Sequence, residues 1–322
     1  MLFLTLLDDK ISEINKKALE YTKTPKTLDT IKETIKQRYL EKRIEDVELE
    51  SNFKKADYIK AIEKAKEYIH QGDIYQINMT QRFNLKKHID AIDLYYILRE
   101  KNPAPFSAFL DLGDIKVGSS SPERFLFLKD DIIETRPIKG TRPRGKDEAG
   151  DSFYKEELIN SEKDRAELNM IVDLERNDLG RFCDYGSVEV TEHAVIEKYA
   201  KVFHSVSTVR GRVRKGYDIS DIIKATFPGG SITGAPKIRA MQIISGLEPD
   251  RRGPYGGAVG YFGYDGDLDS CITIRTAIVK DGRVYVQAGA GIVYDSVPEN
   301  EYQETLNKAE ALFKALNIID KE

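Results

Sequence analysis

The sequence of 322 residues contains no tryptophan, only two cysteines and only four histidines. Cys183 and Cys271 lie far apart in the chain and form no Cys-x-x-Cys pair, so we predict neither a disulfide framework nor a zinc site. Such sparing use of cysteine is typical of a reducing compartment, and we expect a cytoplasmic protein.

Long apolar runs and an excess of one charge are also missing. No apolar run approaches the roughly 20 residues that span a bilayer. The apolar start, Met1 to Leu7, ends at two aspartates and lacks the basic residues and cleavage signal of an export peptide, so we expect no membrane association. The 50 basic and 54 acidic residues leave a formal net charge of −4, which provides no basic surface for nucleic acid.

Periodicity of the apolar residues predicts an α+β fold. Helical spacing covers residues 52–69, and residues 75–83 alternate as a half-buried strand does, with a polar face that we expect near a site. A second helix is predicted at about 153–179. Shorter β-like runs occur at 114–118 and 124–128, before this helix, and at 258–264, 272–280 and 283–288, after it. Asp281-Gly282 between the last two runs predicts a hairpin, so at least part of the sheet is antiparallel.

The chain shows no linker or repeat that would mark a second large domain. Residues 9–50 are crowded with charged residues and suggest one or two solvent-facing helices. We therefore predict a short N-terminal extension over residues 1–50 and one catalytic domain over residues 51–322.

Two charged residues stand beside predicted strands in positions suited to chemistry. Glu123 follows a run of serines, and Lys139 lies in the segment Pro137-Ile138-Lys139-Gly140-Thr141. A lysine that is partly neutral can act as a nucleophile, and a buried glutamate can hold a proton for a leaving group. Taken alone, the two residues fit an exposed ion pair equally well, which is the commoner arrangement.

Paired carboxylates recur on two predicted helices. Asp164 and Glu167 lie one turn apart, and so do Glu301 and Glu304, with Lys308 a further turn along. If the two helix faces meet, they form an oxygen-rich site suited to Mg²⁺. The alternative is a solvated helix face with an ion pair between Glu304 and Lys308.

Two glycine-rich turns can bring backbone N–H groups to an anion. In the first, Thr233 and Gly234 precede a predicted helix whose positive N-terminal end favours a carboxylate. The second contains Gly289 and Gly291. Turns of this kind are more often plain connections.

Two basic residues are candidates for binding a substrate. His204 could donate a hydrogen bond or a proton, although a lone histidine among apolar neighbours is more often part of the core. Arg275 lies in the predicted strand at 272–276, where an inward-facing guanidinium needs an anionic partner. We therefore consider Arg275 a clamp for a carboxylate.

Taken together and in this order, these segments resemble the chorismate-utilising enzymes, a family that includes anthranilate, aminodeoxychorismate, isochorismate and salicylate synthases. The resemblance covers residues 52–316. It rests on seven segments: Gly72-Asp73-Ile74-Tyr75-Gln76-Ile77-Asn78, Ser121-Pro122-Glu123-Arg124-Phe125, Pro137-Ile138-Lys139-Gly140-Thr141, Asp164-Arg165-Ala166-Glu167 through Arg176-Asn177-Asp178-Leu179, Gly234-Ala235-Pro236-Lys237, Gly289-Ala290-Gly291-Ile292 and Glu301-Tyr302-Gln303-Glu304-Thr305.

The resemblance implies two packed, mainly antiparallel sheets with outer helices and a shortened N-terminal region, so inhibition by tryptophan is not expected. It also implies a choice of reaction. Gln76 stands where the water-using members carry a lysine base, and Lys139 stands where anthranilate synthases carry alanine. The chain is therefore most similar to the aminodeoxychorismate synthases, which replace the ring hydroxyl of chorismate with an amino group for the synthesis of para-aminobenzoate and folate.

By the same resemblance, Lys139 and Glu123 are the catalytic residues, and Mg²⁺ is held by Glu167 and Glu304 with help from Asp164 and Glu301. The resemblance assigns chorismate binding to these residues: Gln76, Thr141, His204, Thr233, Gly234, Tyr255, Arg275, Gly289, Gly291 and Lys308.

No cysteine nucleophile of a glutaminase is visible, so ammonia is expected from a separate glutamine amidotransferase subunit. Two alternatives stay open: component I of an anthranilate synthase, and a non-catalytic regulatory protein that binds chorismate.

Overall fold

The computed structural model describes residues 49–86 and 89–316. The predicted helices over residues 9–50 and nearly all of the predicted N-terminal extension lie outside the described residues. No helix in the described ranges is long and apolar enough to cross a membrane.

The strands form two seven-stranded sheets in which every described pairing is antiparallel, so the predicted α+β class is confirmed. The first sheet has the order β1-β2-β14-β13-β4-β3, and β10 pairs with β2. Its strands are β1 (Leu49–Ser51), β2 (Gln76–Lys86), β3 (Phe106–Asp111), β4 (Ile115–Ser121), β10 (Gly234–Ala235), β13 (Thr276–Lys280) and β14 (Arg283–Ile292).

The second sheet has the order β11-β12-β5-β6-β9-β7, and β8 pairs with β9. Its strands are β5 (Arg124–Lys129), β6 (Ile132–Thr135), β7 (Ile138–Pro143), β8 (Glu189–Lys198), β9 (Val202–Arg212), β11 (Ala258–Phe262) and β12 (Leu268–Ile272).

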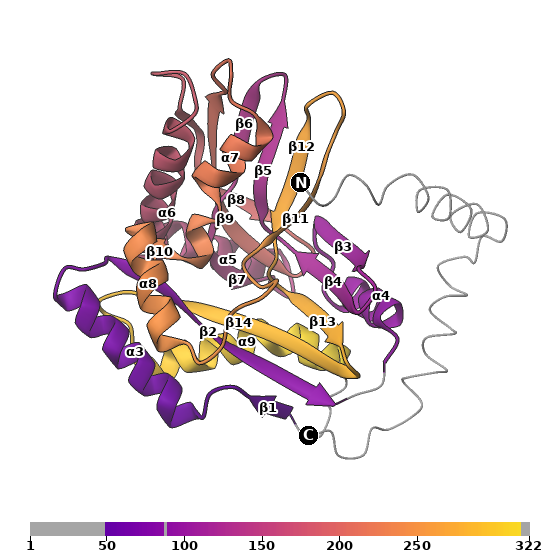
Figure 1. Ribbon diagram of the computed structural model, residues 1–322. Helices are drawn as coiled ribbons and strands as arrows, with labels where there is room; N and C mark the ends of the chain where they lie inside the picture. The colour runs from indigo at the N-terminus through magenta and orange to yellow at the C-terminus, as the bar shows by residue number, and fades with distance from the viewer. Residues whose placement is uncertain (1–48, 87–88, 317–322) are drawn as a thin grey trace. The chain divides into compact units, whose positions relative to one another are not determined.

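Helices cover the outer faces of both sheets (Figure 1). They are α3 (Lys55–His70), α4 (Ala91–Lys101), α5 (Glu148–Asn160), α6 (Glu162–Gly180), α7 (Ile219–Thr226), α8 (Lys237–Leu247) and α9 (Pro298–Ala315), with a short 3₁₀ turn at Gly230–Ile232. Helices α3 and α9 pack against β2 and β14, whereas α6 packs against β9 in the second sheet. Each sheet therefore has its own apolar layer, which includes Ile62 and Met79 in the first and Leu168 and Ile133 in the second.

Several predicted elements are confirmed. The helix expected at 52–69 is α3, and Gly72 after it has a φ of +80°, which suits a glycine. The hairpin predicted at Asp281-Gly282 joins β13 to β14, and both of these residues have positive φ, as a type I′ turn requires. The polar face expected on the strand at 75–83 is buried rather than solvated.

Three predictions about local structure were wrong. The glycine-rich turn expected at Gly289 and Gly291 is part of strand β14, which pairs with β2 along its whole length. The helix expected at 153–179 is two helices, because Ser161 lies between them and its side chain accepts a hydrogen bond from Asp164 N at the start of α6. The strand expected at 272–280 is broken at Arg275, whose φ of +52° is incompatible with an extended strand. Arg275 thus lies between strands rather than within one.

Two of the points at which the chain crosses from one sheet to the other are neighbours. Pro122 and Glu123 link β4 to β5, and residues 273–275 link β12 to β13. Backbone hydrogen bonds tie the crossings together, from Ile272 N to Glu123 O at 3.1 Å and from Ser120 N to Arg275 O at 3.1 Å. Glu123 and Arg275 are therefore held at the junction of the two sheets.

Candidate active site

An irregularity in strand β7 sets the direction of the Lys139 side chain. The register between β7 and β9 shifts between Lys139 and Thr141, and Gly140 between them has a φ of +78°. A Cβ at Gly140 would also lie 2.7 Å from Leu158 Cδ1. Only glycine fits there, which accounts for the Lys-Gly-Thr order of the segment.

The ammonium group of Lys139 reaches across to elements far away in the sequence. Its Nζ lies 3.3 Å from Glu167 Oε2 on α6. A Cβ built on Gly291 of β14 would lie 3.1 Å from the same Nζ and 2.9 Å from Gln76 Nε2 on β2. Lys139, Gln76 and Gly291 therefore converge on one point between the sheets, and Gln76 Oε1 is buried there with no hydrogen-bond partner among the described residues.

Glu123 is a buried carboxyl group whose Oε1 has no hydrogen-bond partner in the described chain. Burial raises the pKa of Glu123 to about 7, although Ser231, Lys139 and Lys308 act in the opposite direction. At neutral pH a substantial share of Glu123 is protonated, so it can donate a proton to a leaving group.

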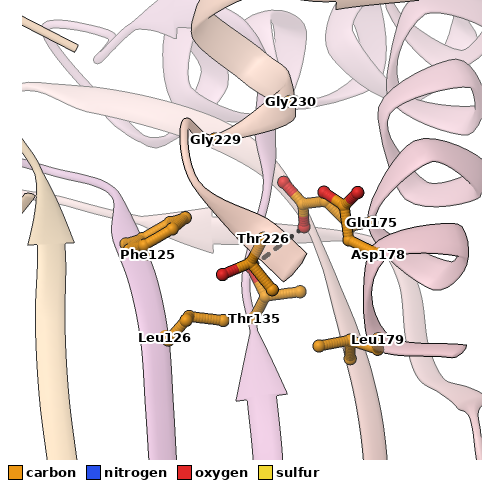
Figure 2. Close-up of a pocket in the computed structure, with 9 residues that line it drawn as sticks. All are labelled: Phe125, Leu126, Thr135, Glu175, Asp178, Leu179, Thr226, Gly229 and Gly230. Atoms are coloured by element: carbon orange, nitrogen blue, oxygen red, sulfur yellow. Dashed lines mark hydrogen bonds between the residues drawn. The ribbon is translucent and has the colours of Figure 1, made fainter. Parts of the chain in front are cut away.

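A cavity of about 10 Å³, room for about one water molecule, lies between α6 and the second sheet. Figure 2 shows the carboxyl groups of Glu175 and Asp178 extending from α6 into it. Thr135 Oγ1 donates to Glu175 Oε2 at 3.0 Å. Burial and the nearby Glu123 raise the pKa of Glu175 well above its usual range. The sequence analysis did not identify Glu175, because nothing in its position along α6 distinguishes it from other helical glutamates.

Two further cations, Lys308 and Arg275, are electrostatic neighbours of Glu123. Lys308 on α9 donates to Gly289 O at 2.9 Å and pairs with Glu304 at 2.5 Å. Burial lowers the pKa of Lys308, and Lys139 and Arg275 lower it further. Burial also lowers the pKa of Arg275, which forms no ion pair with any described carboxylate. Three cations close enough to repel one another mark a site for an anion with more than one negative charge.

The predicted metal carboxylates lie on α6 and α9. Burial raises the pKa of Glu301, and the charges of Glu304 and Glu167 raise it further, so these three groups are electrostatic neighbours. Ser296 Oγ donates to Glu301 Oε1 at 2.7 Å, but Glu301 Oε2 is buried without a partner. Asp164 instead pairs with Arg142 at 3.1 Å.

These carboxylates form no preassembled metal cage in the described ranges. Lysines contact them instead, Lys139 at Glu167 and Lys308 at Glu304. The unpaired buried oxygen of Glu301 is a donor of the kind that a hard cation such as Mg²⁺ prefers, and Mg²⁺ takes few carboxylates and retains water ligands.

His204 lies on β9 beside Thr141, whose Oγ1 is 3.0 Å from His204 Nδ1. Burial lowers the pKa of His204 to about 4, so the imidazole is neutral at physiological pH. A neutral ring can donate one hydrogen bond and accept another, but it adds no charge to the site.

The Thr233–Gly234 turn packs closely on β2. Gly234 pairs with Ile77, and a Cβ on Gly234 would lie 2.2 Å from Gln76 O, so only glycine permits this approach. The Thr233 hydroxyl donates to Gly229 O at 2.9 Å within its own turn. Tyr255 is buried nearby.

Comparison with known proteins places the chain in a family. The family model described as chorismate binding enzyme matches residues 4–314. The chain belongs to the chorismate binding enzymes. It is 48% identical over 270 residues to an aminodeoxychorismate synthase component 1 from Bacillus subtilis, covering 84% of this chain and 57% of that protein. It is equally 48% identical over 270 residues to an anthranilate synthase component 1 from the same organism, covering 84% of this chain and 52% of that protein.

A crystal structure of anthranilate synthase component I from Streptococcus pneumoniae superimposes with a TM-score of 0.81 at 36% identity, covering 95% of this chain and 66% of that one. The predicted fold of two antiparallel sheets is therefore that of a chorismate binding enzyme. The chain spans about half the length of the curated relatives that it matches.

Proposed function

We propose that this chorismate binding enzyme replaces the ring hydroxyl of chorismate with an amino group, giving 4-amino-4-deoxychorismate. The observation that carries the proposal is the position of Lys139, whose Nζ lies between Glu167 and the Gln76–Gly291 contact. An amine at that point can act as a nucleophile only on a substrate seated between the two sheets.

The substrate suits the charges of the site. Chorismate carries two carboxylates. The buried Arg275 forms no ion pair with a described carboxylate, and Lys308, which pairs with Glu304, would share its charge with the substrate. The Thr233–Gly234 turn and the glycines Gly289 and Gly291 of strand β14 bring backbone close to the same space. His204, Thr141 and Tyr255 complete the proposed pocket as neutral hydrogen-bonding groups.

Lys139 would leave its contact with Glu167, give its ammonium proton to solvent and attack ring carbon 2 as the neutral amine. Glu123 would protonate the hydroxyl at carbon 4, which departs as water while the double bond shifts. Ammonia would then add at carbon 4 and expel Lys139, and the proton released from the added nitrogen would return to Glu123. Gln76 cannot act as a base toward water, which favours ammonia as the final nucleophile.

Glu167 and Glu304, with Glu301 and Asp164, would hold the Mg²⁺ ion. When bound, the ion would orient the ring carboxylate and withdraw charge from the ring.

Anthranilate synthesis is the second candidate, because relatives of both names match this chain to the same degree. Lys139 argues against anthranilate synthesis, since the resemblance places alanine at this position in anthranilate synthases. A non-catalytic chorismate-binding protein is disfavoured by the protonatable Glu123 beside Lys139.

The test is to incubate the protein with chorismate, ammonium and Mg²⁺ and to identify the products by mass spectrometry. We expect aminodeoxychorismate without release of pyruvate. Fluorescent anthranilate together with pyruvate would contradict the proposal and support the second candidate. No Mg²⁺-dependent binding or turnover of chorismate would favour the non-catalytic alternative.

A further inference from the structure

A buried ion pair outside the proposed catalytic set joins the segments that carry the substrate residues. Arg252 and Glu248 follow α8, and their side chains are only 14% and 3% exposed. Arg252 Nη2 lies 2.6 Å from Glu248 Oε1, and Arg252 Nε donates to Glu248 Oε2 at 2.9 Å. This two-point contact fixes the plane of the guanidinium group.

The remaining donors of Arg252 bind two backbone carbonyls on different segments. Nη1 donates to Ile232 O and Nη2 to Asn78 O, both at 2.6 Å. Ile232 immediately precedes the Thr233–Gly234 turn, and Asn78 lies two residues after Gln76 on β2. One guanidinium therefore fixes the spacing between the turn and the strand.

Glu248 and Asn78 extend the same network. Glu248 Oε1 accepts from Thr80 N at 2.9 Å and from Thr80 Oγ1 at 2.8 Å. Asn78 N donates to Thr233 O at 2.7 Å, and Asn78 Nδ2 donates to Ile232 O at 3.2 Å.

Packing does not hold these segments on their other side. A cavity of about 430 Å³ borders Thr233, Tyr255 and both members of the ion pair. Arg252 also lies over the Tyr255 ring, with its guanidinium carbon 6.0 Å from the ring centroid. The turn therefore packs on β2 on one side only, and on the side of the cavity the hydrogen bonds of Arg252 hold it.

We propose that Arg252 and Glu248 act as a positioning clamp, which holds the Thr233–Gly234 turn, β2 and Tyr255 at the spacing that binds the substrate carboxylates. This role rests on the proposed function of the site. Neither residue touches the reacting atoms, so the clamp acts on substrate affinity through the residues that it positions.

The test uses a double variant, Arg252→Met with Glu248→Met, because replacing both charges with apolar groups avoids leaving one charge buried and unpaired. The control is Arg82→Lys. Arg82, towards the far end of β2, holds the same loop by pairing with Asp250 at 2.8 Å and contacting Arg251 O, and these side-chain contacts do not reach the Thr233–Gly234 turn.

Hydrogen exchange of the free proteins and calorimetric binding of chorismate with Mg²⁺ are the two readouts. We expect the double variant to exchange the amides of Asn78, Thr80 and Thr233 at least tenfold faster and to bind chorismate at least tenfold more weakly. The Arg82→Lys variant should stay within about twofold of wild type in both. A tenfold loss of affinity corresponds to about 1.4 kcal/mol of binding free energy.

Unchanged exchange in the double variant would overturn the clamp. Faster exchange with unchanged chorismate affinity would overturn its role in substrate binding. A wild-type protein that binds no chorismate would contradict the proposed function instead, and the exchange rates would still decide whether the clamp exists.

Discussion

Glu123 combines deep burial with a carboxyl group that must change its charge during the proposed reaction. Because burial raises its pKa to about 7, the acid form is lost as pH rises through neutrality. We expect kcat/KM to fall about tenfold per pH unit above pH 7 on this limb, and Glu123→Gln to lower kcat by roughly 10²- to 10⁴-fold. The measurement is the ratio of kcat/KM in wild type to kcat/KM in Glu123→Gln at constant free ammonia, because this ratio removes the pH dependence that both proteins share through Lys139. A ratio that stays constant between pH 6 and about 9 would remove Glu123 as the acid.

The raised pKa of Glu123 also predicts that this residue reduces the stability of the folded protein at neutral and alkaline pH. Between its usual pKa of 4.5 and about 7, folded Glu123 binds more protons than unfolded Glu123, so stability falls as pH rises through this window. Glu123→Gln cannot ionise and should therefore be more stable than wild type above pH 7, by up to roughly 3 kcal/mol. Urea unfolding at pH 5 and pH 8 measures the difference. Equal stabilities at pH 8 would contradict the raised pKa.

His204 should behave as a neutral hydrogen-bonding group. Burial lowers its pKa to about 4, so between the ordinary value of 6.5 and about 4 the unfolded protein binds the proton more readily, and stability falls as pH falls through this window. NMR titration of the imidazole should show a midpoint well below 6, and Thr141→Val should change the chemical shift of His204. A midpoint near 6.5 would indicate an exposed ring and remove it from the pocket.

At the scale of the elements, β7, β2 and β14 bring three segments within contact distance. Gly291→Ala would insert a methyl group about 3 Å from both Gln76 Nε2 and Lys139 Nζ. We expect roughly a tenfold or greater loss of kcat/KM, since displacing a catalytic group by even 1 Å is costly. The control is Gly246→Ala in α8, where a Cβ meets nothing within 4 Å. The control should retain activity and gain up to about 1 kcal/mol, and equal activities of the two variants would contradict the convergence at Gly291.

Helices α6 and α9 hold like charges together, which a cation would relieve. Mg²⁺ should raise the Tm of wild type, and chelation should reverse the rise. Glu301→Gln removes one of the repelling carboxylates, so without Mg²⁺ it should be more stable than wild type and respond less to the ion. Glu310→Gln, whose carboxylate pairs with Lys314 along α9, is the matched control. A full Mg²⁺ response in Glu301→Gln would exclude Glu301 from the site.

The elements also explain how much the sequence could predict. Regular periodicity predicted α3 and the β13–β14 hairpin. It missed β8, because register shifts around Glu192 and the positive φ of Ala194 break its alternation. The motifs identified Lys139 and Glu123, but the contact of Lys139 with Gly291 depends on two sheets meeting, which no local pattern encodes. Arg252 was missed for the same reason, since its partners are backbone carbonyls on distant segments.

At the scale of the whole molecule, the proposed reaction needs a supply of ammonia. Both cysteines of the chain are buried, and burial raises the pKa of Cys183 to about 12 and also raises that of Cys271, so neither is suited to act as a glutaminase nucleophile. We expect turnover with ammonium but none with glutamine alone. Adding the cognate glutamine amidotransferase should make turnover glutamine-dependent. Glutamine-dependent turnover by the chain alone would contradict this division of labour.

The central claim is that Lys139 attacks chorismate. Intact-protein mass spectrometry after incubation with chorismate and Mg²⁺, without ammonium, tests it most directly. We predict an adduct of chorismate minus one water on the Lys139 peptide, absent in Lys139→Ala and discharged when ammonium is added. No adduct on the wild-type protein, with Lys139→Ala forming the same product at the same rate, would contradict the account.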